Sequence, residues 1–389
     1  MNNIPSRGFD ISEYGNRLDN IQRLMRSQKM DAILLTTQVD IEYYTGFKTQ
    51  FFQSPTRPWY VLIPSDNKPK AIIPTIGESG MRQTWLDDIQ TWTSPNSTDD
   101  GISLLLATIK SLTSKYKCLG VPKSQESTLR MPLDDYEGLI DSLSGIEIKD
   151  ANKILRQVRL VKSSAEIDKI RHICQLASQG FMDLTDLLKA GDSERENCQR
   201  FKQRLLSLGV DDSPYIVAGS GKDGYGSIIM GPGDKIIEEG DLFIIDTGSV
   251  FDSYFCDFDR NFAFGHICDE AREAYEVVFK ATDAGFRASQ VGNTTSDVFH
   301  AMNDVMQKGG ALGNSVGRLG HGLGLQLTEW SSNTATDNTT LRPGVILTLE
   351  PGMAYLPGKE MAHEENIVIT ESGPEWLTKR ASEELPIIQ

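Results

Sequence analysis

Hydrophobic positions in the first part of the chain follow a helical spacing and then a strand-like one. The helical face recurs at every third or fourth position after Ile11 and consists of Tyr14, Leu18, Ile21 and Met25. The apolar run DAILLTT follows directly, WYVLIP and KAIIPT predict two more strands, and residues 102–112 predict another helix. This alternation predicts an α/β domain over residues 1–155.

A capping signal marks the start of a second domain. Ser163 and Glu166 form an S-x-x-E capping box ahead of a long stretch with apolar residues at helical spacing. Further helical patterns then alternate with strand-like runs such as DLFIID, VILTLE and NIVIT. We therefore expect a second mixed α/β (α+β) domain over residues 156–389, and nearly all residues with chemical character lie in it.

Amino-acid composition and charge exclude some kinds of binding partner. Hydrophobic residues make up 39% of the 389 residues, enough for two buried cores. The net charge of −15 and the lack of a Lys/Arg-rich run argue against a nucleic-acid partner. No run approaches the roughly 20 apolar residues of a membrane span, and MNNIPSRGFD lacks a signal-peptide pattern. These features predict a cytoplasmic protein that acts on a small molecule or a dipeptide.

Acidic residues gather in the second domain at positions that a sheet can bring together. Asp246 ends the predicted strand of residues 242–245, and Asp257 and Asp259 share one face of the next strand. Glu350 precedes a Pro-Gly turn, and Glu364 begins the strand NIVIT. These side chains are candidates for a single site.

His321 joins this set because it lies in the motif GHGLG, whose glycines allow close backbone approach. The four carboxylates of Asp246, Asp257, Glu350 and Glu364 would repel one another unless they are protonated or neutralised. Two divalent cations would balance their charge. The sequence therefore predicts a site for two divalent metal ions, and Mn, Co, Zn and Fe all suit a carboxylate-imidazole site.

The motifs D-T-G, D-x-x-R, G-H-G-x-G and E-P-G, with a late Glu before an apolar strand, resemble those of the pita-bread metallohydrolases. This family includes prolidase, aminopeptidase P, methionine aminopeptidase and creatinase, and the motif spacing resembles that of Xaa-Pro dipeptidases. The resemblance implies a creatinase-like N-terminal domain, a pita-bread catalytic domain and a homodimer. It also implies that Asp246 binds one metal, that Asp257 and Glu364 bridge both, and that His321 and Glu350 bind the second. Glu365 is the rival of Glu364 for the bridging role.

Three positions depart from the peptidases of this family. These enzymes carry a His seventeen residues before the first Asp, a His seven residues after the metal-binding His, and an Arg two residues before the last Glu. The chain has Ile229, Thr328 and Ala362 at those positions. We therefore expect metal-dependent hydrolysis of a small C–N substrate, with weak activity on Xaa-Pro dipeptides.

Several residues are candidates for roles beyond metal binding. Glu350 is the candidate general acid/base, and Asp259 either supports the metal site and accepts a proton or simply pairs with Arg260. Thr328 and Trp330 are candidate substrate contacts, and His363 has either a packing or a ligand-supporting role. The dipeptide Glu329-Trp330 resembles dimethylsulfoniopropionate lyases, so a metal-dependent lyase is the alternative activity. A binding module without catalysis is disfavoured because all five ligands are present.

Three further motifs have competing interpretations. In SPTRPWY, Arg57 and Trp59 either contact substrate across a dimer or belong to a core strand and a solvated loop. Gly219, Gly221 and Gly224 match GxGxxG, but no helix pattern follows, so we expect a loop near the site rather than a dinucleotide site. The D-T-G-S of aspartic proteases occurs once, whereas such an enzyme needs two copies.

Overall fold

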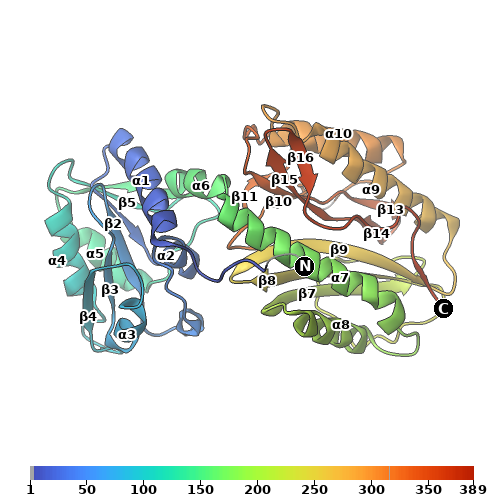
Figure 1. The fold of residues 1–389 in the computed structure, drawn as a ribbon, viewed down its shortest axis with the longest axis horizontal. Coiled ribbons are helices and arrows are strands. Elements are labelled where there is room, and N and C mark those ends of the chain that lie inside the picture. The colour runs from blue at the N-terminus through green and yellow to red at the C-terminus, as the bar shows by residue number, and fades with distance from the viewer. Residues whose placement is uncertain (1–3, 315) are drawn as a thin grey trace. The chain divides into compact units, whose positions relative to one another are not determined.

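The computed structural model describes residues 4–314 and 316–389, and these form two compact units, Ser6–Arg159 and Leu160–Gln389 (Figure 1). The predicted division after residue 155 falls inside helix α6 (Asn152–Leu160). Among the described residues, no helix combines the length and the apolarity that crossing a membrane requires.

The N-terminal unit is built on a six-stranded mixed sheet in the order β4-β3-β2-β1-β5-β6. Its strands are β1 (Ala32–Leu35), β2 (Tyr60–Pro64), β3 (Lys70–Pro74), β4 (Asp88–Trp92), β5 (Cys118–Val121) and β6 (Glu147–Asp150). Its other helical elements are α1 (Ile11–Ser27), α2 (Gln38–Thr45), η1 (Gln50–Gln53), η2 (Thr75–Gly77), α3 (Glu78–Met81), α4 (Ile102–Leu112) and α5 (Leu133–Ser142). The predicted α/β domain is confirmed.

Trp59 and Arg57 differ in their surroundings within this unit. Trp59 is 1% exposed, and its ring lies 5.3 Å from that of Phe47 and 5.6 Å from that of Phe52. Trp59 is therefore a core residue just before β2. This agrees with the second interpretation of SPTRPWY, in which Trp59 belongs to a core strand. Arg57 lies in the preceding loop, where Arg130 donates a hydrogen bond to its carbonyl oxygen.

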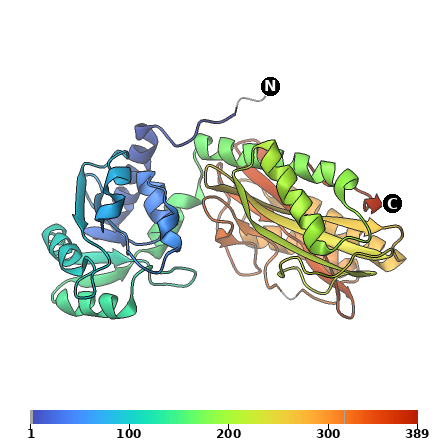
Figure 2. The same ribbon diagram turned by 90° about the horizontal axis from the view of Figure 1, so that it is seen from below.

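The C-terminal unit begins with two helices and three long antiparallel strands. These are α7 (Ser164–Leu187), α8 (Glu194–Leu208), β7 (Asp212–Lys222), β8 (Asp241–Phe251) and β9 (Tyr254–Phe264). The predicted capping box is present, because Ser163 and Glu166 bond each other's backbone N–H groups at the start of α7. With β17 (Ile387–Ile388) the strands form a sheet in the order β17-β9-β8-β7, and α7 and α8 pack against it (Figures 1 and 2).

The rest of this unit repeats the same order of two helices followed by strands. The elements are α9 (Asp269–Ala288), α10 (Thr295–Lys308), β10 (His321–Gly322), β11 (Glu329–Ser332), β12 (Ile346–Leu349), β13 (Gly352–Leu356), β14 (Lys359–Ala362), β15 (Glu365–Thr370) and β16 (Gly373–Trp376). A five-stranded sheet in the order β11-β10-β12-β15-β16 and the β13–β14 hairpin result. Helix α9 packs against β12, β13 and β14, so each half of the unit has its own helix layer.

Two expectations about this unit are wrong in detail. Asp246 lies inside β8 rather than at its end, because the strand continues through Thr247 and Gly248 and pairs on both sides, with β7 and with β9. Gly219 and Gly221 lie in β7 rather than in a loop. A Cβ atom on Gly219 would approach the Ser227 carbonyl oxygen to 2.7 Å, so close backbone approach, not a turn, explains this glycine.

Candidate metal centre

Strand pairing positions the first three carboxylates. Asp246 of β8 is the register partner of Asp259 of β9, and Gly248 is the partner of Asp257. Asp257 and Asp259 are two residues apart on one strand, so their side chains project from the same face. Both are buried, at 4% and 3% exposure. The pairing therefore places the side chains of Asp246, Asp257 and Asp259 within one small region.

Asn366 connects this sheet to the second one. Its Oδ1 accepts a hydrogen bond of 3.0 Å from the Asp257 backbone N–H, and its Nδ2 donates to the Asp257 carbonyl oxygen. Asn366 follows Glu365 at the start of β15. The oxygen and the nitrogen of its side-chain amide therefore both hold β9 beside this strand. Glu364, the residue before β15, is thereby brought to Asp257.

His321 is oriented by its own backbone surroundings. Its Nδ1 lies 2.9 Å from the Gly322 carbonyl oxygen, so the ring proton is on Nδ1 and Nε2 carries a lone pair. The backbone N–H of His321 donates to Thr348 Oγ1 at 3.1 Å. The preceding Gly320 has φ +116°, and a Cβ atom there would lie 2.2 Å from the Thr348 carbonyl oxygen, so only glycine fits.

Asp257, His321 and Glu364 offer ligand atoms that all lie within 4.8 Å of one another. His321 Nε2 is 3.4 Å from Asp257 Oδ2. With the ring proton on Nδ1, two hydrogen-bond acceptors face each other there. Such an arrangement is unfavourable for the protein alone and suits a cation between the two atoms.

Three buried carboxylate oxygens also indicate a cation at this position. Asp246 Oδ1, Asp259 Oδ1 and Glu364 Oε1 have no hydrogen-bond partner among the described residues. Burial raises the pKa of each of these carboxyls well above its ordinary value, and neighbouring carboxylates raise it further. A buried acceptor without a donor costs roughly 1–3 kcal/mol, and charged groups cost more. Divalent cations would remove this cost, so the residues present fit a metal centre.

Glu350 completes the candidate set from a third strand end. It follows β12 directly, and its backbone N–H donates to the Leu319 carbonyl oxygen at 3.2 Å, two residues before His321. Burial raises its pKa, and Asp257 raises it further while His321 lowers it. The structure thus brings all five predicted ligands into one buried cluster.

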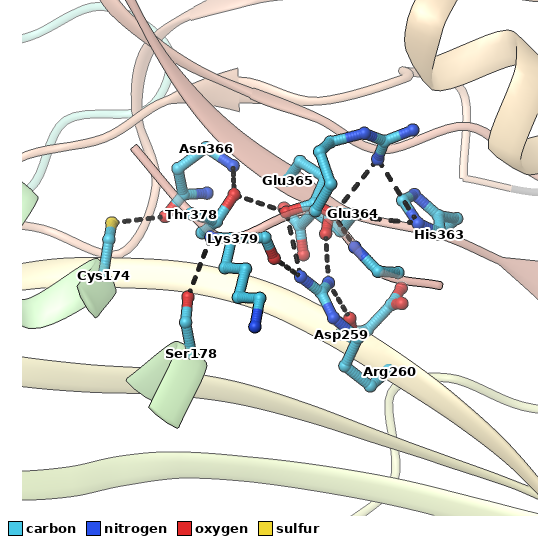
Figure 3. A network of polar contacts seen from close by, with 12 residues as sticks. Cys174, Ser178, Asp259, Arg260, His363, Glu364, Glu365, Asn366, Thr378 and Lys379 are labelled. Atoms are coloured by element: carbon cyan, nitrogen blue, oxygen red, sulfur yellow. Dashed lines mark hydrogen bonds and ion pairs between the residues drawn. The ribbon is translucent and has the colours of Figure 1, made fainter. Parts of the chain in front are cut away.

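Glu365, the rival of Glu364, has a different environment. Its carboxylate accepts hydrogen bonds from Arg260, from Arg380 at 3.1 Å, from Thr378 and from the backbone N–H of Ala381. Arg260 also donates to the Asp259 and Glu364 carbonyl oxygens, at 2.6 and 3.1 Å (Figure 3). The lone pairs of Glu365 are thus occupied by the protein, whereas Glu364 keeps an oxygen without a partner.

His363 lies behind the centre and packs against α9. It is 1% exposed, its Nδ1 lies 3.0 Å from Thr282 Oγ1, and its Nε2 lies 3.5 Å from Arg380 Nη1. Burial lowers its pKa well below the ordinary value, and the charge of Arg380 lowers it further. His363 is therefore a neutral packing residue that contacts the partners of Glu365.

The predicted substrate contacts lie at the surface or near it. Thr328 is exposed and Trp330 is half-buried, on either side of the start of β11. Ile229, where the peptidases carry a His, is 78% exposed, whereas Ala362 is buried. These positions offer the centre no imidazole and no guanidinium.

Arg318 is the residue that sequence reasoning missed. It lies three residues before His321, and its Nη2 donates to Thr328 Oγ1 at 3.4 Å. Burial raises the pKa of Asp257 and of Glu350 and lowers that of His321, and the positive charge of Arg318 opposes the first two shifts and adds to the third. A charged residue next to a glycine-rich ligand motif was the available signal.

The two units match two known sequence families. Residues 168–371 match metallopeptidase family M24, and residues 17–161 match the creatinase/prolidase N-terminal domain. The chain belongs to metallopeptidase family M24. It is therefore a metal-dependent hydrolase with a creatinase-type first domain and a pita-bread second domain, as the resemblance implied.

The individual relatives in family M24 match nearly the whole chain, but at low sequence identity. An uncharacterized peptidase of Staphylococcus saprophyticus is 27% identical over 93% of this chain and 99% of its own. A prolidase of Thermococcus sibiricus, with a TM-score of 0.87 and 22% identity, and a dipeptidase of Mycobacterium ulcerans, with 0.85 and 23%, each cover 98% of this chain and are themselves fully covered. These structures show that the fold is shared, and they do not identify the substrate of this chain.

Proposed function

We propose that this M24 protein holds two divalent cations and hydrolyses a C–N bond in a small carboxylate-bearing substrate. The observation that carries the proposal is the set of partnerless oxygens of Asp246, Asp259 and Glu364 beside the acceptor pair of Asp257 and His321. As the family resemblance implies, Asp246 would bind one cation, Asp257 and Glu364 both, and His321 and Glu350 the second. Such ions supply a Lewis acid and lower the pKa of a water molecule.

The protein side chains then have distinct tasks. Glu350 would accept a proton and return it to the leaving nitrogen, because its carboxyl lies in the same cluster and burial raises its pKa. Asp259, whose Oδ1 has no partner, lies opposite Asp246 and holds a proton or orients the water. Asn366 and Thr348 fix Asp257 and the His321 backbone, so the ligands are rigid before substrate arrives.

The substrate class follows from the charges at the mouth of the cluster. Arg318 has a hydrogen bond of 3.4 Å to Thr328, a weak contact that a substrate carboxylate can replace. The missing histidines at positions 229 and 328 remove groups that peptidases use for the peptide and its tetrahedral intermediate. Losing one such stabilising group costs roughly 100- to 1000-fold. We therefore expect small amides or amidines with a carboxylate, rather than Xaa-Pro dipeptides, as good substrates.

The alternative lyase activity needs a base that removes a proton next to a carboxylate. Glu329, part of the lyase-like dipeptide, has its carboxylate 3.0 Å from Lys162 Nζ, and both side chains are buried. This ion pair gives Glu329 a structural role. Hydrolysis is the function that the site supports best.

A substrate panel on metal-loaded protein tests this proposal. It should contain Ala-Pro, Leu-Pro, creatine, ectoine and dimethylsulfoniopropionate, with products identified by mass. A product that has gained water from a C–N substrate supports hydrolysis, whereas elimination products without added water would establish the lyase. Turnover of Ala-Pro at rates usual for metallopeptidases would restore the plain prolidase interpretation.

Three properties belong to the same proposal and have direct tests. We propose manganese as the first metal to try, a homodimer and a cytoplasmic location. Elemental analysis, light scattering after gel filtration and cell fractionation test the three in turn. In the dimer, Arg57 would approach the partner's site, so Arg57→Ala should raise KM without changing metal content.

A further inference from the structure

A pocket of about 240 Å³ opens in the C-terminal unit and is separate from the metal centre. Arg260 and Phe262 of β9 line it, whereas none of the five candidate metal ligands does. Residues at positions 258, 260 and 262 project from the face of β9 opposite Asp257 and Asp259. Phe181 of α7 lies against this face, with its ring centroid 5.1 Å from that of Phe258. Asn261 of β9 and Tyr275 of α9 also line the pocket, so it lies beside β9 between α7, α9 and the C-terminal segment.

The walls of this pocket are largely apolar, and its polar side chains are cations, hydroxyls and the amide of Asn261. The aromatic rings of Phe181, Phe262 and Tyr275 line it, together with the hydroxyls of Ser178, Thr185 and Ser382 and the cations Arg260, Lys379 and Arg380. No Asp or Glu is among the described residues that line it. A positive lining is unusual in a chain with a net charge of −15.

Two of the three cations are already neutralised. Arg260 pairs with Glu365 at 3.0 Å, and Arg380 pairs with Glu365 and with Asp283 at 2.8 Å. Lys379 differs, because its Nζ contacts only the thioether of Met182 among the described residues. The ammonium group lies outside the network around Glu365 in Figure 3. One positive charge at the pocket is thus left without a carboxylate.

We propose that this pocket binds a small organic carboxylate with an apolar body, independently of the metal centre and of the proposed hydrolysis. The carboxylate pairs with Lys379 and accepts from the pocket hydroxyls, while the apolar body packs against Phe181 and Tyr275. An inorganic anion would leave the aromatic walls in contact with water, and a neutral apolar molecule would gain no charge pairing with the exposed ammonium of Lys379. The cavity has room for a ligand about the size of one aromatic ring.

Arg260 links this pocket to the metal centre. Its guanidinium lines the pocket and also holds the carbonyl oxygens of Asp259 and Glu364. A ligand that packs on Arg260 therefore contacts the residue that fixes the backbone at both of these positions.

The direct test is a titration of the metal-loaded protein with 4-fluorobenzoate, followed by fluorine NMR. We expect saturable binding of 4-fluorobenzoate. The neutral 4-fluorobenzamide should bind at least about tenfold more weakly, because the amide lacks the charge that pairs with Lys379. Lys379→Met should weaken 4-fluorobenzoate binding about tenfold or more, and the matched control Lys308→Met, an exposed lysine on α10, should stay within about twofold. Thr185→Trp, which fills the mouth of the pocket, should abolish binding.

Two outcomes separate this site from the metal centre and from failure to fold. Binding should persist after EDTA treatment, and binding that disappears with the metals would overturn the proposal. Lys379 is exposed, so Lys379→Met should keep the parent's melting temperature. Binding that is equal in the Lys379→Met variant, or that does not saturate below about 10 mM, would also contradict the proposal.

Discussion

Two adjacent glutamates of the C-terminal unit show opposite ways of burying a charge. Glu365 is 0% exposed and is surrounded by donors from Arg260, Arg380, Thr378 and a backbone N–H. Glu364 is 2% exposed and has an oxygen without a partner, among carboxylates that raise its pKa well above the ordinary value. The hydrogen-bonding capacity of Glu365 is satisfied by the protein itself, whereas that of Glu364 is not.

This difference separates a structural charge cluster from a ligand-binding one. Paired buried charges are kept because removing one partner leaves the other uncompensated. Unpaired buried carboxylates are costly unless a cation supplies the missing charge. The Glu365 network therefore stabilises the fold, and the Glu364 cluster is the part of the unit that we propose binds cations.

The largest effect is expected from Glu364→Gln. The variant should bind metal at least about 100-fold more weakly, a larger loss than replacing a supporting group beside a metal causes. Its fold should remain intact, because the substitution removes a buried charge that has no partner. Metal titration and circular dichroism check both parts, and unchanged metal affinity would show that Glu364 is not a ligand.

Glu365→Gln should act on stability instead. Arg260 and Arg380 would lose their shared carboxylate, and breaking such a buried network costs roughly 3–5 kcal/mol in the free energy of unfolding. The matched control is Glu375→Gln, which removes an exposed pair with Arg171 at 3.2 Å and should cost about 0–1 kcal/mol. Urea denaturation measures both variants, and equal costs would contradict the assigned role of the network.

The metal-free protein should lose stability as pH rises. Burial raises the pKa of Asp246, Asp257, Asp259 and Glu364 in the folded state, so these groups bind protons more tightly than in the unfolded chain. The stability they contribute is complete below their unfolded pKa of about 4 and is lost as pH rises through the raised values. Melting temperatures in EDTA should therefore fall as pH rises above about 4.5.

Neutral variants sharpen this pH test. Asp259→Asn removes one titrating group and should make the fall in melting temperature shallower in EDTA. Saturating Mn²⁺ should remove most of the fall, because the cations bind the ionised carboxylates of the folded state. A metal-free protein whose stability increases over the same range would show that these carboxyls are ionised and paired.

The smallest effect concerns Arg318, the cation at the mouth of the Glu364 cluster. Arg318→Gln should raise KM for a carboxylate-bearing substrate about tenfold and change kcat much less, because a charged hydrogen bond to the substrate is lost. The control Arg342→Gln changes an exposed arginine of the same unit and should leave KM unchanged. A variant that lowers only kcat would place Arg318 in the chemistry rather than in binding.

Sequence reasoning predicted the parts of this molecule that depend on local pattern. The helix face from Tyr14 to Met25, the capping box at Ser163 and the shared face of Asp257 and Asp259 each follow from spacing within one element. The preference for Glu364 over Glu365 as a ligand stays a prediction, and the structure places Glu364 beside Asp257 and His321.

The errors arose where distant segments decide the outcome. Asp246 lies inside β8 because β7 and β9 extend the strand, and a hydrophobic run ending at residue 245 carries no sign of that pairing. Arg260 and Asn366 connect elements about a hundred residues apart, so their partners were not visible locally. A polar residue inside the strand ENIVIT was the sign available for Asn366.

Metal stoichiometry tests the central claim most directly. Protein stripped with EDTA should be incubated in turn with excess Mn²⁺, Co²⁺, Zn²⁺ and Fe²⁺, desalted and analysed for metal per chain. The account predicts two ions per chain for at least one of these metals, loss of the pair in Asp257→Ala, and parent-like content in Glu365→Gln wherever that variant is folded. A folded parent chain that stays metal-free with all four metals, or Asp257→Ala protein that still binds two ions, would contradict it.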